Sequence, residues 1–263
     1  MIEKQLYDEM CNEFFPVFKQ FAATEKYAIT LGGSHGKGLA DKSSDFDFRV
    51  YFEVPVGMEI MHGLFDQVSA LVYKWKERGV EVDGVWPRSF GEIDGQLDQW
   101  LSGHGNPVHM EWNVWGYNIL TDIFNQQIME DPYGVARQWK ARLAEYPETL
   151  KNAIVQKHCS SLRYWRNDYH YINKVNRKDV VFLASITARL VHDMMQVIYA
   201  LNHFYFPGDG MNLKYMGGFA IKPIRFEERI KSALYPERDG DIFLDQYTIV
   251  SGLIDEVLNL AAG

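Results

Sequence analysis

Residues 31–48 read LGGSHGKGLADKSSDFDF and join two β-prone segments through a glycine-rich turn. The first segment, Tyr27–Leu31, ends at the turn, and the second, Asp45–Val54, follows it. The second segment alternates between apolar residues (Phe46, Phe48, Val50 and Phe52) and polar or aromatic ones (Asp45, Asp47, Arg49 and Tyr51). Because the side chains of a strand point alternately to its two faces, this pattern predicts a strand with one apolar face. The stretch therefore predicts a strand–turn–strand unit that carries two aspartates on one face.

The glycine-rich turn fits neither of two common phosphate-binding motifs. A P-loop needs four residues between its first glycine and the Gly-Lys-Ser/Thr step, whereas three separate Gly32 from Gly36-Lys37, and Gly38 replaces the hydroxyl residue. The dinucleotide-binding fingerprint would need a glycine where Asp41 stands. Both motifs are therefore excluded.

The turn and the two aspartates together suit a nucleotide polyphosphate with magnesium. Glycines let backbone N–H groups approach phosphate oxygens, and a short helix after the turn would offer its positive end. Asp45 and Asp47 stand two residues apart on one strand face, where their carboxylates repel each other unless a cation neutralises them. Hard divalent cations take such oxygen ligands. The combination favours a functional site over a pair of solvated surface aspartates.

This constellation resembles the signature of the DNA polymerase β-like nucleotidyltransferase superfamily, in which Gly-Ser precedes Asp-x-Asp. Here the signature reads Gly33-Ser34 and then Ser44-Asp45-Phe46-Asp47. Kanamycin and lincosamide nucleotidyltransferases similarly join such a catalytic domain to a C-terminal helical bundle. A bacterial family without an assigned function is also similar, with this early motif and a late N-x-x-Y-x-P…K pattern. In this chain the late pattern is matched by Asn202 to Pro207 and then Lys214.

The resemblance implies an α+β protein with two domains. Residues 1–133 would form a nucleotidyltransferase-fold mixed sheet with helices, and residues 134–263 an all-α helical bundle. Hydrophobic spacing and capping signals predict helices at 2–24, 58–78, 89–101, 106–123, 135–145, 148–175, 178–205, 225–235 and 243–261. A further strand is predicted at Val80–Trp86, closed by Pro87, and a strand at 108–115 is the alternative to the helix at 106–123.

The resemblance also implies a reaction and its cofactors. The protein would transfer a nucleoside monophosphate from a nucleoside triphosphate, in the first place ATP, to an acceptor hydroxyl group. Asp45 and Asp47 would bind two Mg²⁺ ions, which would stabilise both oxygens of an in-line displacement. The triphosphate would be bound by Gly33, Ser34 and Ser44, and by Lys214 as a point charge.

Enzymes of this superfamily usually carry a third carboxylate on a neighbouring strand, which binds metal or acts as a base. Asp83 is the favoured candidate, because the strand Val80–Trp86 follows the helix after the Asp-x-Asp strand. Glu81 shares its strand face and is an alternative. Glu111 is the other alternative, but it requires a strand at 108–115, whereas Asn106-Pro107 favours a helix there.

The composition limits which classes of partner and which cellular location we expect. A net charge of −8 over 263 residues disfavours stable nucleic-acid binding and favours a small-molecule acceptor, such as a cationic aminoglycoside-like compound. Two cysteines, Cys11 and Cys159, without metal-ligand spacing indicate a reducing compartment, and a cytoplasmic location is expected. The apolar stretch 180–206 is interrupted by charged and polar residues, which predicts a buried helix of the bundle and no membrane span.

Two interpretations remain open beside the enzyme. A catalytically inactive nucleotide-binding regulator, or antitoxin-like module, would bind the same ligands without turnover. In a purely structural protein, the placement of Asp45 and Asp47 on one strand face would have no function. Three histidines of the helical half, His158, His192 and His203, lack metal-ligand spacing in the sequence and are expected to be structural or exposed. The oligomeric state is not indicated by the sequence.

Overall fold

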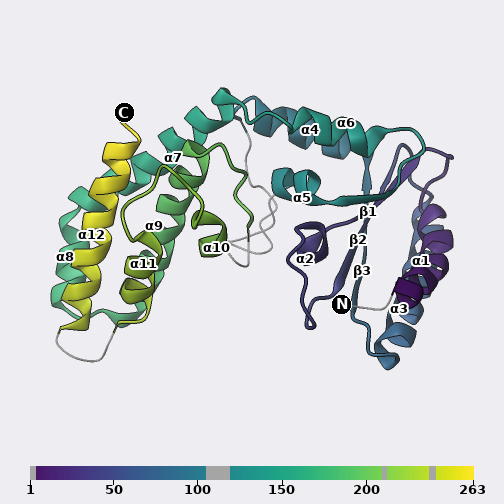
Figure 1. The fold of residues 1–263 in the computed structure, drawn as a ribbon, viewed down its shortest axis with the longest axis horizontal. Helices are drawn as coiled ribbons and strands as arrows, with labels where there is room; N and C mark the ends of the chain where they lie inside the picture. Colours follow the sequence, from purple (N-terminus) through teal and green to yellow (C-terminus); the bar gives the residue numbers. More distant parts are fainter. Residues whose placement is uncertain (1–3, 105–118, 209–211, 237–240) are drawn as a thin grey trace. The chain divides into compact units, whose positions relative to one another are not determined.

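The structure, a computed structural model, describes residues 4–104, 119–208, 212–236 and 241–263 (Figure 1). The described residues fall into two compact units. The first contains those up to Asp98 together with Ile119–Glu145, and the second contains the others. The first unit includes residues on both sides of 133, at which the sequence predicts the end of the catalytic domain, and that domain boundary stays a prediction. The predicted division into a mixed α/β half and a helical half is nevertheless the one observed.

A four-stranded mixed sheet forms the centre of the first unit, with strand order β3-β2-β1-β4. β1 (Tyr27–Leu31) pairs antiparallel with β2 (Phe46–Phe52) and with β4 (Gln127–Glu130), while β2 pairs parallel with β3 (Val82–Ser89). The described helices of this unit are α1 (Lys4–Lys19), α2 (Gly33–Gly36), α3 (Met58–Glu77), α5 (Ile119–Asn125), α6 (Val135–Arg142) and α4 (Phe90–Leu101), whose last three residues belong to the second unit. The predicted helix-and-mixed-sheet organisation of this half is confirmed.

Both faces of the sheet are covered by helices (Figure 1). On one face, the apolar side chains of β2 pack with those of α1 and α3, and Phe14, Phe48 and Trp75 are fully buried there. The other face carries the alternate residues of β2, and Tyr51 is fully buried with its ring centroid 5.0 Å from that of Trp139 in α6. The face of β2 that bears the aspartates is therefore covered by α6 further along the strand, at Tyr51.

All the regular secondary-structure elements that the structure describes in the second unit are helices. Its helices are α7 (Glu148–Asn167), α8 (Tyr169–Asn176), α9 (Val180–Leu201), α10 (Asn212–Met216), α11 (Phe226–Leu234) and α12 (Ile242–Leu260). α9 packs against α7 and α12 and supplies much of the core. By length and composition α9 could cross a membrane, but 56% of its apolar window is buried within the protein, as is typical of a core helix.

Several element boundaries differ from those that the sequence predicts. The helix predicted at 148–175 is two helices, because Asp168 lies between them and accepts a hydrogen bond from the His170 N–H at 2.8 Å as the N-cap of α8. The predicted end of a strand at Pro87 was wrong. β3 runs on to Ser89, since it is an edge strand and needs no N–H from Pro87 on its open side. The competing helix and strand at 106–123 fall largely on residues 105–118, outside the described residues.

Candidate functional site

The glycine-rich turn rests directly on the Asp-x-Asp strand. The backbone N–H of Gly32 donates to the carbonyl oxygen of Asp47 at 2.9 Å. Gly33 follows with φ +56°, and a Cβ atom built on it would lie 1.7 Å from Asp47 Oδ2. No side chain fits at this position while the carboxylate keeps its place. Gly33 is therefore required both by its backbone conformation and by its contact with Asp47.

Two of the predicted acids, Asp45 and Asp83, act electrostatically on the third, Asp47. Asp45 immediately precedes β2, and the parallel register pairs Phe46 with Val82 and Phe48 with Val85, with an irregularity between these pairs. Asp47 and Asp83 thus occupy neighbouring strands at the same level of the sheet. Burial, against the opposing effect of Arg49 and together with the charges of Asp45, Asp83 and Asp122, raises the pKa of Asp47 to about 6. A carboxylate here is destabilised unless more positive charge is supplied.

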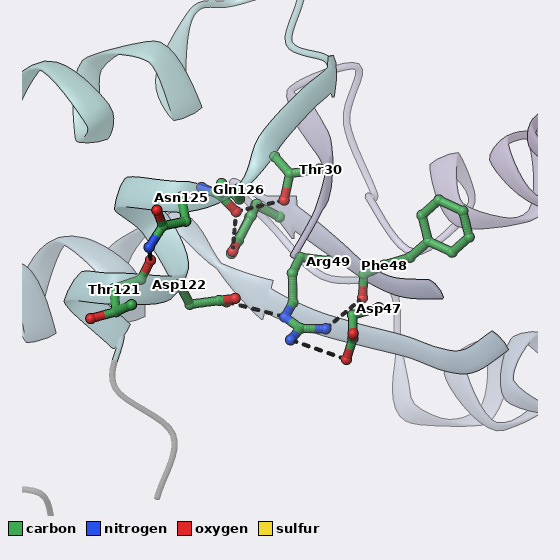
Figure 2. A network of polar contacts seen from close by, with 9 residues as sticks. Thr30, Asp47, Phe48, Arg49, Thr121, Asp122, Asn125 and Gln126 are labelled. Carbon is green, nitrogen blue, oxygen red and sulfur yellow. Dashed lines mark hydrogen bonds and ion pairs between the residues drawn. The ribbon is translucent and has the colours of Figure 1, made fainter. Parts of the chain in front are cut away.

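Arg49 supplies part of that charge, and it lies between two acids (Figure 2). Its Nε donates to Asp122 Oδ2 at 3.1 Å, and its NH2 group lies 3.6 Å from Asp47 Oδ1. Side-chain exposures of 8% for Arg49 and 7% for Asp122 mean that the pair is shielded from water. Removing one partner of such a buried pair leaves an unpaired buried charge and strongly destabilises the folded protein. Arg49 therefore connects α5, which carries Asp122, to the carboxylate of Asp47.

The same side of the sheet contains a second, uncharged polar group (Figure 2). Gln126 Oε1 accepts hydrogen bonds from Thr30 Oγ1 at 2.6 Å and from the Tyr51 hydroxyl at 3.0 Å. All three side chains are buried. These bonds join the end of α5 to β1 and β2, and so they hold the helix that presents Asp122.

Comparison with known proteins agrees with this geometry. Residues 11–102 match the family described as nucleotidyltransferase domain, a range that contains the turn, Asp45, Asp47 and Asp83. This chain carries an N-terminal nucleotidyltransferase domain. The predicted resemblance to the polymerase β-like superfamily is thereby confirmed. No curated protein matches the chain.

The nucleotidyltransferase domain supports a general activity and leaves its details open. Such a domain transfers a nucleoside monophosphate from a nucleoside triphosphate and generally uses a divalent metal. Residues 112–210 match a second family, a domain of unknown function (DUF4037). Asp122 falls within this second match, whereas its partner Arg49 falls within the first. The site of the nucleotidyltransferase domain is therefore supported by a residue from outside its own family match.

The structure distinguishes the candidates for the third carboxylate of the nucleotidyltransferase domain. Glu81 is exposed and forms an ion pair with Lys76 at 3.2 Å on the surface beside α3. Asp83 is exposed too, but it lies close enough to Asp47 to raise the pKa of that residue. Glu111 lies outside the described residues. Among the described alternatives, Asp83 is the one that the fold brings to Asp47, and its role in metal binding or proton transfer stays a prediction.

The residues that are predicted to bind the triphosphate differ in their hydrogen bonds and in their location. The hydroxyl oxygen of Ser34 is buried and has no hydrogen-bond partner among the described residues. Ser44 Oγ, by contrast, accepts from the Asp41 N–H at 2.9 Å, so it helps to build the turn before β2. Lys214 is exposed on α10, in the second unit. Ser34 is thus the predicted ligand whose bonding capacity is unused, and the roles of Ser44 and Lys214 stay predictions.

The acids of the nucleotidyltransferase domain fit a hard divalent cation. Asp45, Asp47 and Asp83 offer only carboxylate oxygens, the donors that magnesium prefers. Their ligand oxygens do not all lie within 4.8 Å of one another, so a shared cation requires them to move closer. The raised pKa of Asp47 provides a reason for such movement, since a cation would offset the cost of its charge. Neither Arg49 nor Asp122 was singled out by the sequence for this site.

Proposed function

We propose that the protein transfers a nucleoside monophosphate from ATP to a hydroxyl group of a small-molecule acceptor, with two Mg²⁺ ions bound by Asp45, Asp47 and Asp83. The observation that supports this most directly is the destabilised carboxylate of Asp47, held between Gly33 and Arg49 beside two further acids. The nucleotidyltransferase match supports the general reaction. The adenosine specificity, the metal and the acceptor belong to the proposal.

Each residue of the site has a role in this reaction. The acceptor oxygen attacks the α-phosphorus, an oxygen–phosphorus bond forms, and the bond to the departing pyrophosphate breaks. Ser34 Oγ donates its unused hydrogen bond to a phosphate oxygen. Arg49 orients the carboxylate of Asp47, and Asp83 accepts the proton of the attacking hydroxyl group or completes the metal site. Bound magnesium supplies the positive charge that neutralises the triphosphate.

The charge of the protein supports a cationic or neutral acceptor. A net charge of −8 attracts positively charged small molecules, such as aminoglycoside-like compounds, and repels polynucleotides. A cytoplasmic location supplies ATP and keeps Cys11 and Cys159, both buried and free, reduced. Fold similarity alone does not choose the acceptor, so a panel of compounds must do so.

The test is pyrophosphate release from ATP with Mg²⁺ across aminoglycosides, lincosamides and protein acceptors. Acceptor-dependent release is expected, together with a product heavier by one adenylate in mass spectrometry. Asp83→Asn should abolish release, whereas Glu81→Gln, at the residue before β3, should leave it near normal, because Glu81 forms an ion pair with Lys76 on the surface. If ATP binds with Mg²⁺ but no acceptor gives release, the nucleotide-binding regulator replaces the enzyme.

A further inference from the structure

A second group of metal-ligand side chains lies in the helical unit, far along the chain from the acids of the nucleotidyltransferase domain. It consists of His158 on α7 and of His192 and Asp193 on α9. Their ligand atoms all lie within 4.8 Å of one another, and no other such group of three occurs in the part of the chain that the structure describes. The group falls within the DUF4037 match, outside the nucleotidyltransferase match.

Both imidazoles present the same kind of nitrogen to one carboxylate oxygen. His158 Nδ1 lies 2.6 Å from Asp193 Oδ1, and His192 Nδ1 lies 3.9 Å from the same atom. Tetrahedral ligands that each lie about 2.1 Å from a zinc ion are separated by about 3.4 Å. To reach this separation, the distance from His158 Nδ1 to Asp193 Oδ1 would have to lengthen, and the distance from His192 Nδ1 to the same oxygen would have to shorten, each by less than one ångström. Small side-chain rotations are enough for this.

Further contacts hold these groups in orientations suited to metal binding. Ser161 Oγ donates to the other oxygen of Asp193 at 2.7 Å, which leaves Oδ1 to the two histidines. His192 Nε2 lies 3.1 Å from the side-chain nitrogen of Gln196, which donates to it in this arrangement. With the Gln196 amide turned over, its oxygen would accept the Nε2–H of an imidazole whose Nδ1 binds a metal ion. Partners of this kind, which hold the ligands from behind, are characteristic of metal sites in proteins.

The site is enclosed but not sealed. Side-chain exposures are 12% for His158, 15% for His192 and 7% for Asp193, so an ion can reach the group from solvent. A metal ligand must be neutral imidazole, with the ring proton moved to the nitrogen that faces away from the ion.

We propose that His158, His192 and Asp193 bind one divalent transition-metal ion of the zinc class in the helical unit. Two imidazoles and one carboxylate are the donors found in zinc sites and in other first-row metal sites that keep positions open to water. Magnesium and calcium are disfavoured, because these ions prefer sets made up of oxygen ligands. This site is separate from the Asp-x-Asp site and does not depend on the proposed transfer reaction.

The experiment uses the full chain, without a histidine tag and stripped of metal, in the Asp45→Asn, Asp47→Asn background. This background weakens the first metal site, and excess Mg²⁺ occupies other oxygen-rich sites. Titration with Zn²⁺ by calorimetry should show one equivalent bound. Co²⁺ in place of Zn²⁺ should give the visible absorption of a nitrogen-and-oxygen site, and added Zn²⁺ should remove it.

His158→Gln and His192→Gln should each weaken Zn²⁺ binding at least about 100-fold, since each removes one of three ligands. His170→Gln is the matched control. His170 forms a similar pair, with its Nδ1 2.8 Å from Asp168 Oδ1, but it is not part of a group of three metal ligands among the described residues. Circular dichroism verifies that each variant is folded.

The proposal is overturned if the protein with His158, His192 and Asp193 intact binds no equivalent of Zn²⁺ at micromolar concentrations. This result does not depend on whether the histidine variants fold. It is also overturned if folded His158→Gln binds as tightly as its parent. Equal losses in His170→Gln and His158→Gln would show that exposed histidines bind the ion non-specifically, which contradicts the proposal as well.

Discussion

Asp47 is the residue whose surroundings are most specific, since it lies against the glycine turn and Arg49 and its pKa is raised by the charges of neighbouring acids. Asp47→Asn and Asp45→Asn are each expected to lower adenylate transfer at least ~100-fold, because each removes one anionic ligand of the cation that stabilises the transition state. The apolar face of β2 is unchanged, so the fold should persist. Pyrophosphate release measures the rate, and Glu53→Gln, an exposed acid paired with Lys26 at 2.7 Å, is the control. Near-normal release from either variant contradicts the two-metal site.

The raised pKa of Asp47 predicts how stability depends on pH in the metal-free protein. The pKa is about 6 when folded and 3.8 in the ordinary reference, so between these values the folded state binds more protons than the unfolded one. The free energy of unfolding that comes from this group therefore decreases as pH rises from about 4 to about 6. Asp47→Asn removes this dependence and should raise the melting temperature at pH 7 while it abolishes activity.

Chemical denaturation of the wild type and of Asp47→Asn at several pH values checks this expectation. The difference between their free energies of unfolding should be smallest near pH 4 and increase toward pH 7. Saturating Mg²⁺ should reduce the difference, since the cation favours the charged carboxylate. A difference that is independent of pH would show that the surroundings of Asp47 do not disfavour its charge.

Gly33 and Gly38 form a matched pair within one turn. Both have positive φ, +56° and +68°, but a Cβ atom at Gly38 meets nothing within 4 Å, whereas one at Gly33 would meet Asp47 Oδ2. Gly38→Ala should cost about 1–2 kcal/mol of backbone strain and retain ATP binding. Gly33→Ala adds displacement of Asp47, so it should lose ATP and Mg²⁺ binding as well. Similar ATP affinities of the two folded variants, measured by calorimetry, would show that the contact has no functional effect.

At the scale of elements, the N-terminus of α4 offers a simple test of the local sequence signals. Ser89 Oγ accepts the Glu92 N–H at 3.2 Å, as the predicted capping box requires. Ser89→Ala should lower the free energy of unfolding by ~1 kcal/mol. Ser102→Ala, near the other end of this helix, removes only exposed hydrogen bonds, to the Gln99 carbonyl and to His104 Nδ1, and should change stability less. Equal effects would show that the bond does not stabilise the helix start.

Elements with strong local signals could be predicted from the sequence, and weakly patterned ones could not. α3 and α9 show clear helical periodicity, and β2 shows clear alternation, so their predicted positions agree closely with the observed ones. β4 has only four residues and no alternating pattern, and it exists because β1 pairs with it. The break between α7 and α8 depends on Asp168 acting as a cap, which apolar spacing does not indicate.

The candidate sites show the same limit. Gly33, Ser34, Asp45 and Asp47 lie in one short stretch, so their association could be recognised from the sequence. The pairing of Arg49 with Asp122 joins residues far apart in the chain, and the alternation of β2 suggested only that Arg49 lies on the polar face. The histidine cluster likewise arises from the packing of α7 against α9, which sequence spacing does not reveal.

At the scale of the whole molecule, the two units have separate hydrophobic cores. One core gathers side chains of α1, α3 and the sheet, and the other gathers those of α7 to α12. The candidate nucleotide site lies on the first unit and the proposed zinc-class site on the second. A ligand stabilises the state to which it binds, so each ligand should act first on its own unit.

Hydrogen exchange with mass spectrometry can follow the two units in one sample. A non-hydrolysable ATP analogue with Mg²⁺ at 100 times its Kd should increase the opening free energy of β1, β2 and β3 by up to about 2.7 kcal/mol. Zn²⁺ should instead protect α7 and α9, which carry the histidines and Asp193. Asp47→Asn should remove the first effect and leave the second, and His158→Gln should do the reverse. If the nucleotide protects α7 and α9 as strongly as the sheet, the helical unit takes part in nucleotide binding beyond the predicted contact with Lys214, and the assignment of that site chiefly to the first unit is wrong.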